Sequence, residues 1–354
     1  MEDVVAAVDT INSKNTGEEN ARVEGCDKAY RRLDFQTAMM LCRPLAEKGN
    51  AVAQARLGDM YSSLTSVPYP TRDYTEAAKW YRKAAELGLA YAQKNLGSFY
   101  KSGIGVEKNY EKAFEWGLRA ANQGVAAHWF ISDLYKDGIG VRQNYEESYF
   151  WLLIAIQIEP GVNSRSSSDV VGYLTAEQRA SVKKRVAEWK AVAPDNASEE
   201  VIENWRKVVA DRTNEIKDQS RRFSAKAEEG YPAFQIKMGD YYEVGNGVPH
   251  DLSEAAKWYR RAANQADVVG QWRLAEMYQT GSGVEQNWEE AYFWYSLAIR
   301  LDGRLKHSGA NSEIEKVATH LSSEQKAGID KRVAGWTHGE PEFVIKQRQG
   351  SKLK

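Results

Sequence analysis

The two cysteines are the side chains of this sequence with the most evident chemistry. Cys26 and Cys42 lie eight residues on either side of Asp34, where a turn between two helices is expected. In an antiparallel helix pair such positions face each other, so a disulfide can form there, and it would indicate an oxidising compartment. The alternative is a pair of buried free thiols that pack as small apolar groups. Both interpretations stay open, because Cys42 occupies a core position of its segment.

No other residues are spaced as a catalytic or metal-binding motif requires. Gly103-Ile-Gly105 has the glycines of a phosphate-binding loop, but it follows no expected strand and lacks the Lys-Ser/Thr pair, so a turn between helices is favoured. Neither G-x-S-x-G nor H-E-x-x-H occurs, and two cysteines are too few for a zinc site built from cysteines alone. The five histidines are scattered, at His128, His250, His307, His320 and His338. We therefore expect a protein that is not an enzyme and has no catalytic residues, metal or cofactor.

Composition argues against two further classes of partner. The chain has 354 residues, with 48 Lys and Arg against 49 Asp and Glu, so its net charge is -1. A protein that coats nucleic acid carries a clear basic excess, so no nucleic-acid partner is expected. The longest apolar stretch, Tyr149 to Ile158, is about half as long as a bilayer-spanning helix requires. Insertion into a membrane is therefore not expected.

The two ends of the chain are polar. Residues 1–25 lack the apolar core that follows the basic start of a signal peptide. If Met1 is the true start, we expect a cytoplasmic protein, whereas a trimmed N-terminus would allow a periplasmic or secreted one. Residues 1–25 and the basic segment 339–354 are both expected to be disordered.

Tryptophan spacing indicates how the remaining chain is organised. Trp80, Trp116 and Trp151 are 36 and 35 residues apart, and Trp258 and Trp294 are again 36 apart. A fixed period of this length is the signature of a repeat architecture.

Each repeat predicts a pair of helices joined by a loop. In one copy, Ala77, Trp80, Tyr81, Ala84 and Ala85 form one apolar stripe at helical spacing. The Gly-x-Gly-Val segments predict the end of the preceding helix, because glycine accepts positive φ. Before four of the second helices stands an N-cap residue followed three positions later by glutamate, which resembles a capping box, whereas Asn109 is followed by Lys112. The four caps are Asp73, Asn144, Asp251 and Asn287.

This unit resembles the Sel-one-like repeat, the longer-looped relative of the tetratricopeptide repeat. The resemblance covers roughly Tyr30 to Trp189 and Ser224 to Trp336. It implies an all-α fold, a right-handed α-solenoid of helix-turn-helix repeats. It also implies a protein that binds other proteins or peptides as an adaptor, without chemistry of its own.

Two segments repeat at a larger scale and suggest two arrays. Leu174 to Trp189 resembles Leu321 to Trp336, and each is expected to be a closing helix with a polar outer face. We expect a first array with its closing helix at 26–192, a helical spacer at 193–223, and a second array with its closing helix at 224–338.

The resemblance implies that the first helices of the repeats line a concave groove. We expect one inner surface along the stacked helices, or two sites if a bend between the arrays divides it, and we name the part in each array separately. The first groove comprises Arg56, Asp59, Asn95, Ser98, Phe130 and Asp133, and the second groove comprises Lys237, Asp240, Arg273 and Glu276. Residue types differ between copies at these positions while the core positions repeat, as expected of a ligand-contacting face. The alternative is an ordinary solvated helix face.

The leading hypothesis for function is a scaffold that holds a protein or peptide partner in these grooves. The alternative is a carbohydrate-binding or enzyme-associated module that uses tryptophan and tyrosine as platforms. The sequence favours the scaffold, because the repeated tryptophans occupy core positions. Trp129 and Trp272, which are equivalent residues, are expected either to pack beneath the closing helices or to present binding surface.

Overall fold

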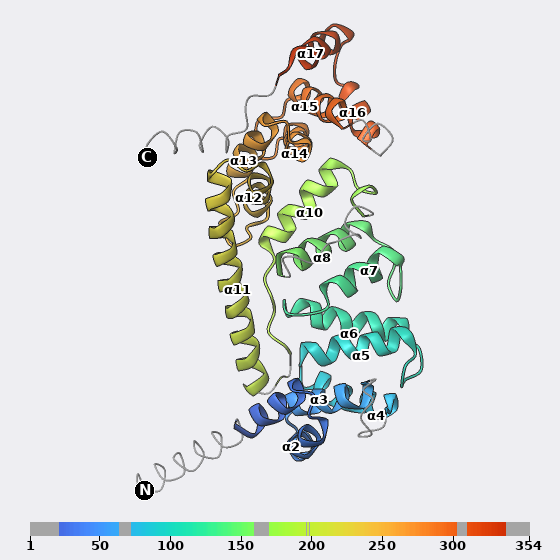
Figure 1. Cartoon of the computed structure of the whole chain (residues 1–354). Coiled ribbons are helices and arrows are strands. Elements are labelled where there is room, and N and C mark those ends of the chain that lie inside the picture. Colours follow the sequence, from blue (N-terminus) through green and yellow to red (C-terminus); the bar gives the residue numbers. More distant parts are fainter. Residues whose placement is uncertain are drawn as a thin grey trace, which may run out of the picture. The chain divides into compact units, whose positions relative to one another are not determined.

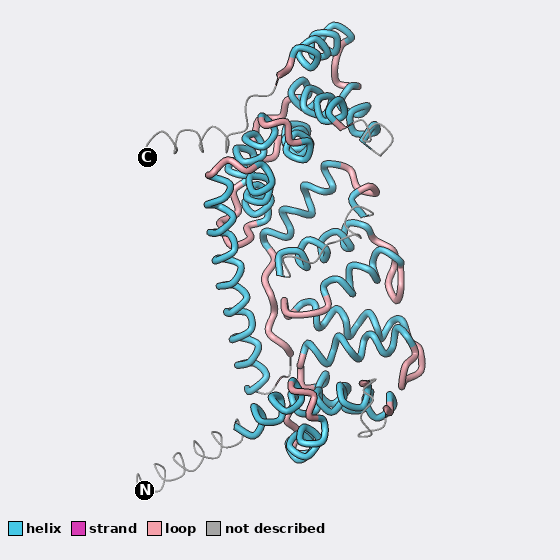
Figure 2. The backbone as a smooth tube through the Cα atoms, in the orientation of Figure 1, coloured by secondary structure: helices cyan, strands magenta, loops and turns pink. Residues whose placement is uncertain are grey.

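The computed structural model describes residues 21–63, 72–158, 170–195, 197, 199–302 and 310–337. These residues form helices joined by turns and loops, with no strand among them (Figures 1 and 2). The all-α fold expected from the sequence is therefore confirmed. Disorder was expected in residues 1–25 and 339–354. Of these, residues 1–20 and 339–354 lie outside the described residues. Residues 21–25 belong to a helix that spans 21–31.

The chain divides into two compact units. The first comprises residues 1–143 and 190–209. After the helix at 21–31, its helices are α2 (Phe35–Glu47), α3 (Ala51–Ser62), α4 (Tyr74–Glu86), α5 (Ala90–Ser102), α6 (Tyr110–Asn122) and α7 (His128–Asp137). A long helix, α11 (Glu199–Glu228), contributes its first residues to this unit and the rest to the second.

The second unit comprises residues 144–189 and 210–354. Its helices besides α11 are α8 (Tyr145–Ile158), α10 (Ala176–Glu188), α12 (Pro232–Val244), α13 (Leu252–Asn264), α14 (Val268–Thr280), α15 (Trp288–Leu301), α16 (Ala310–Ala318) and α17 (Ser323–Gly335). The boundary differs from that of the two arrays expected from the sequence. Helices α8 and α10 group with the second unit, because α10 packs against α12 and α14 as well as against α8.

The repeated tryptophans and tyrosines build the core, with one exception. Trp80, Trp151, Trp258 and Trp294 are all buried. Trp116 is only partly buried, and it lines a shallow cavity of about 330 Å³ together with residues of the 192–195 segment. The expectation that every repeated tryptophan fills the core is therefore wrong at this position.

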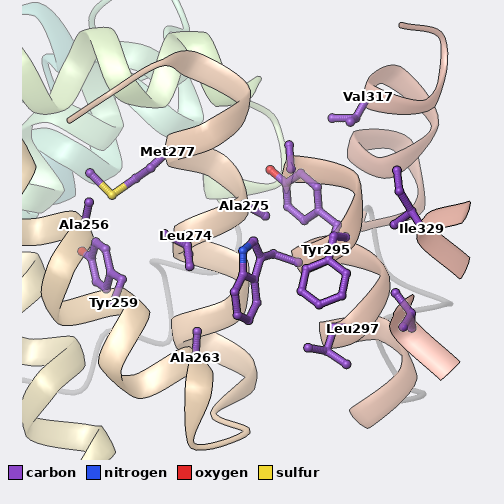
Figure 3. Packing of buried hydrophobic residues seen from close by; sticks show 14 of the residues in the cluster. Ala256, Tyr259, Ala263, Leu274, Ala275, Met277, Tyr295, Leu297, Val317 and Ile329 are labelled. Atoms are coloured by element: carbon purple, nitrogen blue, oxygen red, sulfur yellow. The ribbon is translucent and has the colours of Figure 1, made fainter. Parts of the chain in front are cut away.

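Successive helices of the second unit share one apolar core. Figure 3 shows Tyr259 and Ala263 on one side of Leu274, with Tyr295 and Leu297 on the other. Alanines at the contacts let neighbouring helices approach closely, and the aromatic rings fill the remaining volume. No repeat could bury its apolar stripe alone, so neighbouring repeats stabilise each other.

The two glycines of each Gly-x-Gly-Val turn have different tasks. Gly103 ends α5 with a φ of 70°, a left-handed conformation that glycine adopts without strain. Gly105 also has positive φ, and a Cβ there would lie 2.0 Å from the carbonyl oxygen of Tyr74. The second glycine therefore lets the turn pass against the start of the preceding repeat's second helix.

The expected N-caps are present, but the expected capping boxes are not formed by the predicted glutamates. Asp73 accepts a hydrogen bond from the Glu76 backbone N–H at 3.0 Å, and Asn287 accepts one from Glu290 at 3.0 Å. The glutamate side chains form ion pairs instead, Glu76 with Lys79 and Glu290 with Arg332. Reciprocal capping boxes occur at the closing helices, in the pairs Thr175 with Gln178 and Ser322 with Gln325.

Candidate partner-binding grooves

The cysteine pair lies at the start of the first unit. Cys26 and Cys42 form a disulfide, with their Cα atoms 5.1 Å apart, and both side chains are fully buried. The bond links the helix at 21–31 to α2 across the turn at Leu33, whose φ is positive. Of the two interpretations of the cysteine pair, the structure contains the disulfide.

Arg56 organises the N-terminal end of the first groove. Its guanidinium contacts Asp27 at 2.6 Å and Asp59 at 2.9 Å. It also lies over the ring of Tyr30, 4.7 Å from the centroid. Burial lowers the pKa of Arg56, but its hydrogen bond to Asp59 and the charge of Asp27 raise it more, so the pKa lies above its ordinary value. Arg56 is therefore a fixed cation.

Asp59 is buried and receives hydrogen bonds from two tyrosines, one in its own repeat and one in the next. The hydroxyls of Tyr81 and Tyr91 donate to it at 2.7 and 2.8 Å. Burial and the negative charge of Asp59 raise the pKa of both tyrosine hydroxyls above the ordinary value, so both remain protonated donors. Tyr91 leaves 40% of its surface exposed. Asp59 thus positions a solvent-accessible aromatic ring rather than offering a free charge.

The middle of the first groove is a partly exposed polar surface with one aromatic ring. Asn95, Ser98 and Asp133 are half-buried. Phe130 is also half-buried, and it packs so closely on Gly117 that a Cβ there would lie 2.6 Å from its ring. The ammonium of Lys101 lies 5.6 Å from the Phe130 ring centroid, and Lys136 lies 3.6 Å from Asp133. Beyond the residues expected here, Lys101 lies near the Phe130 ring and Lys136 near Asp133, while Tyr91 lies near Asp59.

The second groove is more enclosed than the first. Lys237 is exposed and Asp240 half-buried, whereas Glu276 is buried. The Tyr259 hydroxyl donates to Asp240 at 2.8 Å, and Arg273 lies 3.8 Å from Asp240 and 3.4 Å from Glu276. This surface is a network of ion pairs and hydrogen bonds among α12, α13 and α14.

Helix α10 covers the buried part of the second groove. Arg179 forms an ion pair with Glu276 at 2.7 Å, and Lys183 forms one with Glu243 at 2.6 Å. Arg179 and Lys183 are only 4% and 6% exposed. We expected α10 to be a closing helix with a polar outer face; it covers α8 and the face is polar, but that face is buried against α12 and α14 instead of facing solvent. The sequence pattern that indicated this contact was a pair of cations one helical turn apart, Arg179 and Lys183. The equivalent residues of α17 are Lys326 and Asp330.

The charged residues between α10, α12 and α14 determine the protonation states of Glu276 and Lys183. Burial alone would raise the pKa of Glu276, but the positive charges of Arg179, Arg273 and Lys183 outweigh it and lower the pKa to about 2. Burial lowers the pKa of Lys183, yet the Glu243 carboxylate raises it more, to above its ordinary value. Both groups are therefore charged at neutral pH.

Trp272 belongs to this network. Its ring lies 4.5 Å from the Tyr295 ring, and its indole N–H donates to Glu276 at 3.1 Å. It packs against the core that also contains Ile329 and Val333 of α17. Its equivalent in the first unit, Trp129, is half-buried.

Two expected absences can be checked only over the described residues. Among them, no cluster of three or more His, Cys, Asp or Glu side chains could hold a metal ion. In the same part of the chain, no helix is long and apolar enough to cross a membrane.

Comparison with known proteins identifies the repeats. The family model described as the Sel1 repeat matches residues 51–89, 90–125, 125–157, 232–267 and 268–303, which together make up about half of the chain. The chain belongs to the Sel1 repeat family. Sel1 repeats are generally non-catalytic modules for protein–protein interaction. The matched segments include all five pairs of helices that carry the repeated tryptophan.

Two solved structures are similar to this Sel1 repeat protein. A protective antigen of uropathogenic Escherichia coli that displays an SLR fold is 24% identical, and the match covers 90% of this chain and 74% of that one with a TM-score of 0.32. A Sel1 repeat protein from Oxalobacter formigenes is 21% identical over 87% of this chain and 96% of that one, with a TM-score of 0.34. No curated protein matches.

Proposed function

We propose that this protein is a non-catalytic scaffold that binds a protein or peptide partner in the first groove. The observation that carries the proposal is the exposed Tyr91 ring, which the buried Asp59 holds in place by a hydrogen bond. Aromatic residues and arginine supply much of the binding energy at protein interfaces. A ring held by a buried hydrogen bond loses little conformational freedom on binding.

The charges of the first groove favour a polar segment with some acidic residues. Lys94 and Lys101 lie near the Tyr91 and Phe130 rings, while Asp59 is already engaged by Arg56 and two tyrosines. The second groove contributes less to this function, since Glu276 and Glu243 are paired with α10. Its residues Lys237, Asp240 and Arg273 are therefore secondary candidates for contact with a partner.

The alternative carbohydrate-binding function gains no support from the repeat tryptophans. A sugar platform requires an aromatic face open to solvent, and the four buried repeat tryptophans provide none.

The test compares two tyrosines of equal exposure in the same unit. Tyr91 is 40% exposed in the groove, and Tyr110 is 39% exposed at the start of α6. Partners recovered with the purified full-length protein should bind Tyr91→Ala and Phe130→Ala at least about tenfold more weakly, a loss of about 1.4 kcal/mol. Tyr110→Ala should bind as the wild type does. If both groove variants keep the wild-type affinity and the wild-type circular dichroism, the recognition surface lies elsewhere.

We further propose that the protein works in an oxidising compartment, periplasmic or secreted. The buried Cys26–Cys42 disulfide supports this over the cytoplasmic alternative, because disulfides persist in oxidising compartments and are rare in reducing ones. Protein taken from its native cells under acid quench and alkylated should show no label at either cysteine. Two labelled cysteines would support a cytoplasmic protein.

A further inference from the structure

Helices α10 and α17 dock against their own repeats in the same way. In each, a glutamine and an arginine reach two consecutive glutamates at the start of the second helix of the covered repeat, α8 or α15. The hydrogen bonds are Gln178 to Glu146 at 2.8 Å, Arg185 to Glu147 at 2.7 Å, Gln325 to Glu289 at 2.7 Å and Arg332 to Glu290 at 2.8 Å. This shared face accounts for the role of each helix in covering a repeat.

The opposite faces of the two helices differ. At the equivalent positions, helix α17 has Lys326, which is half-buried and donates to the Ala318 carbonyl, and Asp330, which is exposed. Helix α10 presents Arg179 and Lys183, which are buried and paired with Glu276 and Glu243. Covering the end of a repeat does not require this second, charged face.

The carboxylates of Glu243 and Glu276 are each oriented by a hydrogen bond from an aromatic side chain. Glu243 accepts a hydrogen bond from the Tyr259 hydroxyl at 2.9 Å, and Glu276 accepts one from the Trp272 indole at 3.1 Å. Arg273 on the same array lies 3.4 Å from Glu276. The carboxylates lie on α12 and α14, so a single helix with two cations one turn apart reaches both.

Buried ion pairs are a poor way to stabilise a core, because desolvation offsets most of the attraction. They are instead selective, because an uncompensated charge at either position is strongly unfavourable. Intramolecular interfaces of this polar kind resemble those between separate proteins.

We propose that the second groove, with Glu243 and Glu276 as its anchors, is a binding site for a basic amphipathic helix with cations at positions i and i+4. Helix α10 is its resident ligand. A partner helix of the same pattern binds by replacing α10, so α10 acts as a built-in competitor. The effective concentration of a tethered ligand is in the millimolar range, so the wild-type groove stays closed to weak ligands.

The experiment weakens the contact of α10 with the second groove in the full-length chain and adds the helix as a separate peptide. The variant Arg179→Glu/Lys183→Glu places like charges opposite Glu276 and Glu243. The probe is a synthetic peptide of residues 175–189 with the native sequence, titrated by fluorescence anisotropy. We expect the variant to bind the peptide at least about tenfold more tightly than the wild type does.

Two peptides of equal net charge provide the matched control. Lys183→Glu removes a cation that contacts Glu243, whereas Lys184→Glu removes its exposed neighbour. The Lys184→Glu peptide should bind the opened chain at least about tenfold more tightly than the Lys183→Glu peptide. Equal affinity of these two peptides, or equal binding of the native peptide to wild type and variant, would overturn the proposal.

A second variant covers the case in which charge reversal prevents folding. Arg179→Gln/Lys183→Gln removes both cations without adding repulsion, and it replaces the first variant in the same titrations. If neither variant keeps the helical circular dichroism of the wild type, α10 is an integral part of the fold rather than a ligand, and the proposal is wrong.

Discussion

The repeated tryptophans show how one residue type serves two environments. Trp258 and Trp116 hold the same repeat position, and each lies beneath an arginine, with Arg261 at 4.5 Å and Arg119 at 4.8 Å from the ring centroid. Trp258 is 7% exposed and packs with Ala227 and Met238, whereas Trp116 borders a cavity. The burial of a repeat tryptophan is therefore determined by its neighbours in adjacent segments and not by the tryptophan itself.

This pair gives a prediction about stability. Trp258→Ala should lower the free energy of unfolding by about 3–5 kcal/mol, because it leaves a cavity in a closed core. Trp116→Ala should cost at least about 1 kcal/mol less, since part of its surface is already in water. Urea unfolding followed by circular dichroism measures both, and equal losses would show that Trp116 is as buried as Trp258.

A second prediction concerns acid. Glu276 has its pKa lowered from 4.5 to about 2 in the folded protein, so its charge stabilises the fold above pH 4.5. This contribution should disappear as the pH falls from about 4.5 to about 2. Glu276→Gln should be less stable at neutral pH and should lose less further stability over that acid range. Glu285→Gln, at an exposed loop carboxylate, should keep the wild-type slope in denaturation titrations at each pH.

At the scale of elements, buried glutamine amides connect successive hairpins. Gln93 donates to the Ala85 carbonyl at 3.1 Å, and its own oxygen accepts from Gln123 at 2.9 Å. Gln235 accepts in the same way from Gln265 at 2.8 Å. His128, aligned with these glutamines in the sequence, is buried at the same position of α7.

Two positions of this series, Gln54 and Gln271, are incomplete, and the first leads to a third prediction. The Gln54 side-chain oxygen is buried without a hydrogen-bond partner among the described residues, and Leu87 stands where the donors Gln123 and Gln265 stand. Leu87→Gln should supply the donor and stabilise the protein by up to about 1 kcal/mol. Leu87→Asn carries the same amide on a side chain that is too short, so it should not stabilise. A melting temperature that falls for the glutamine variant as far as for the asparagine variant would contradict the argument.

The helices could be predicted from the sequence because the residue patterns that specify them are local. The tryptophan period, the alanine stripes and the glycine turns each act within one hairpin, and the observed helices follow them. The groove was harder to predict, because its state depends on which distant segment lies on it. Nothing near Glu276 indicates that Arg179, almost a hundred residues earlier, is its partner. Repeat equivalence did locate Arg56, Phe130 and Arg273 on one kind of face, but it could not separate an open face from a covered one.

At the scale of the whole molecule, stacked repeats contact mainly their neighbours, so a local change should stay local. The disulfide provides the test. It closes a loop of 16 residues between the helix at 21–31 and α2, and such a crosslink contributes about 3 kcal/mol. Cys26→Ser/Cys42→Ser should therefore speed hydrogen exchange in α2 and α3, which pack in the same core cluster. Helices α12 to α15 belong to the other compact unit and should exchange at the wild-type rate. Mass spectrometry of the exchanged peptides separates the two groups of helices. Faster exchange throughout both groups would mean that the protein unfolds as one cooperative body and that its units do not hold independent stability.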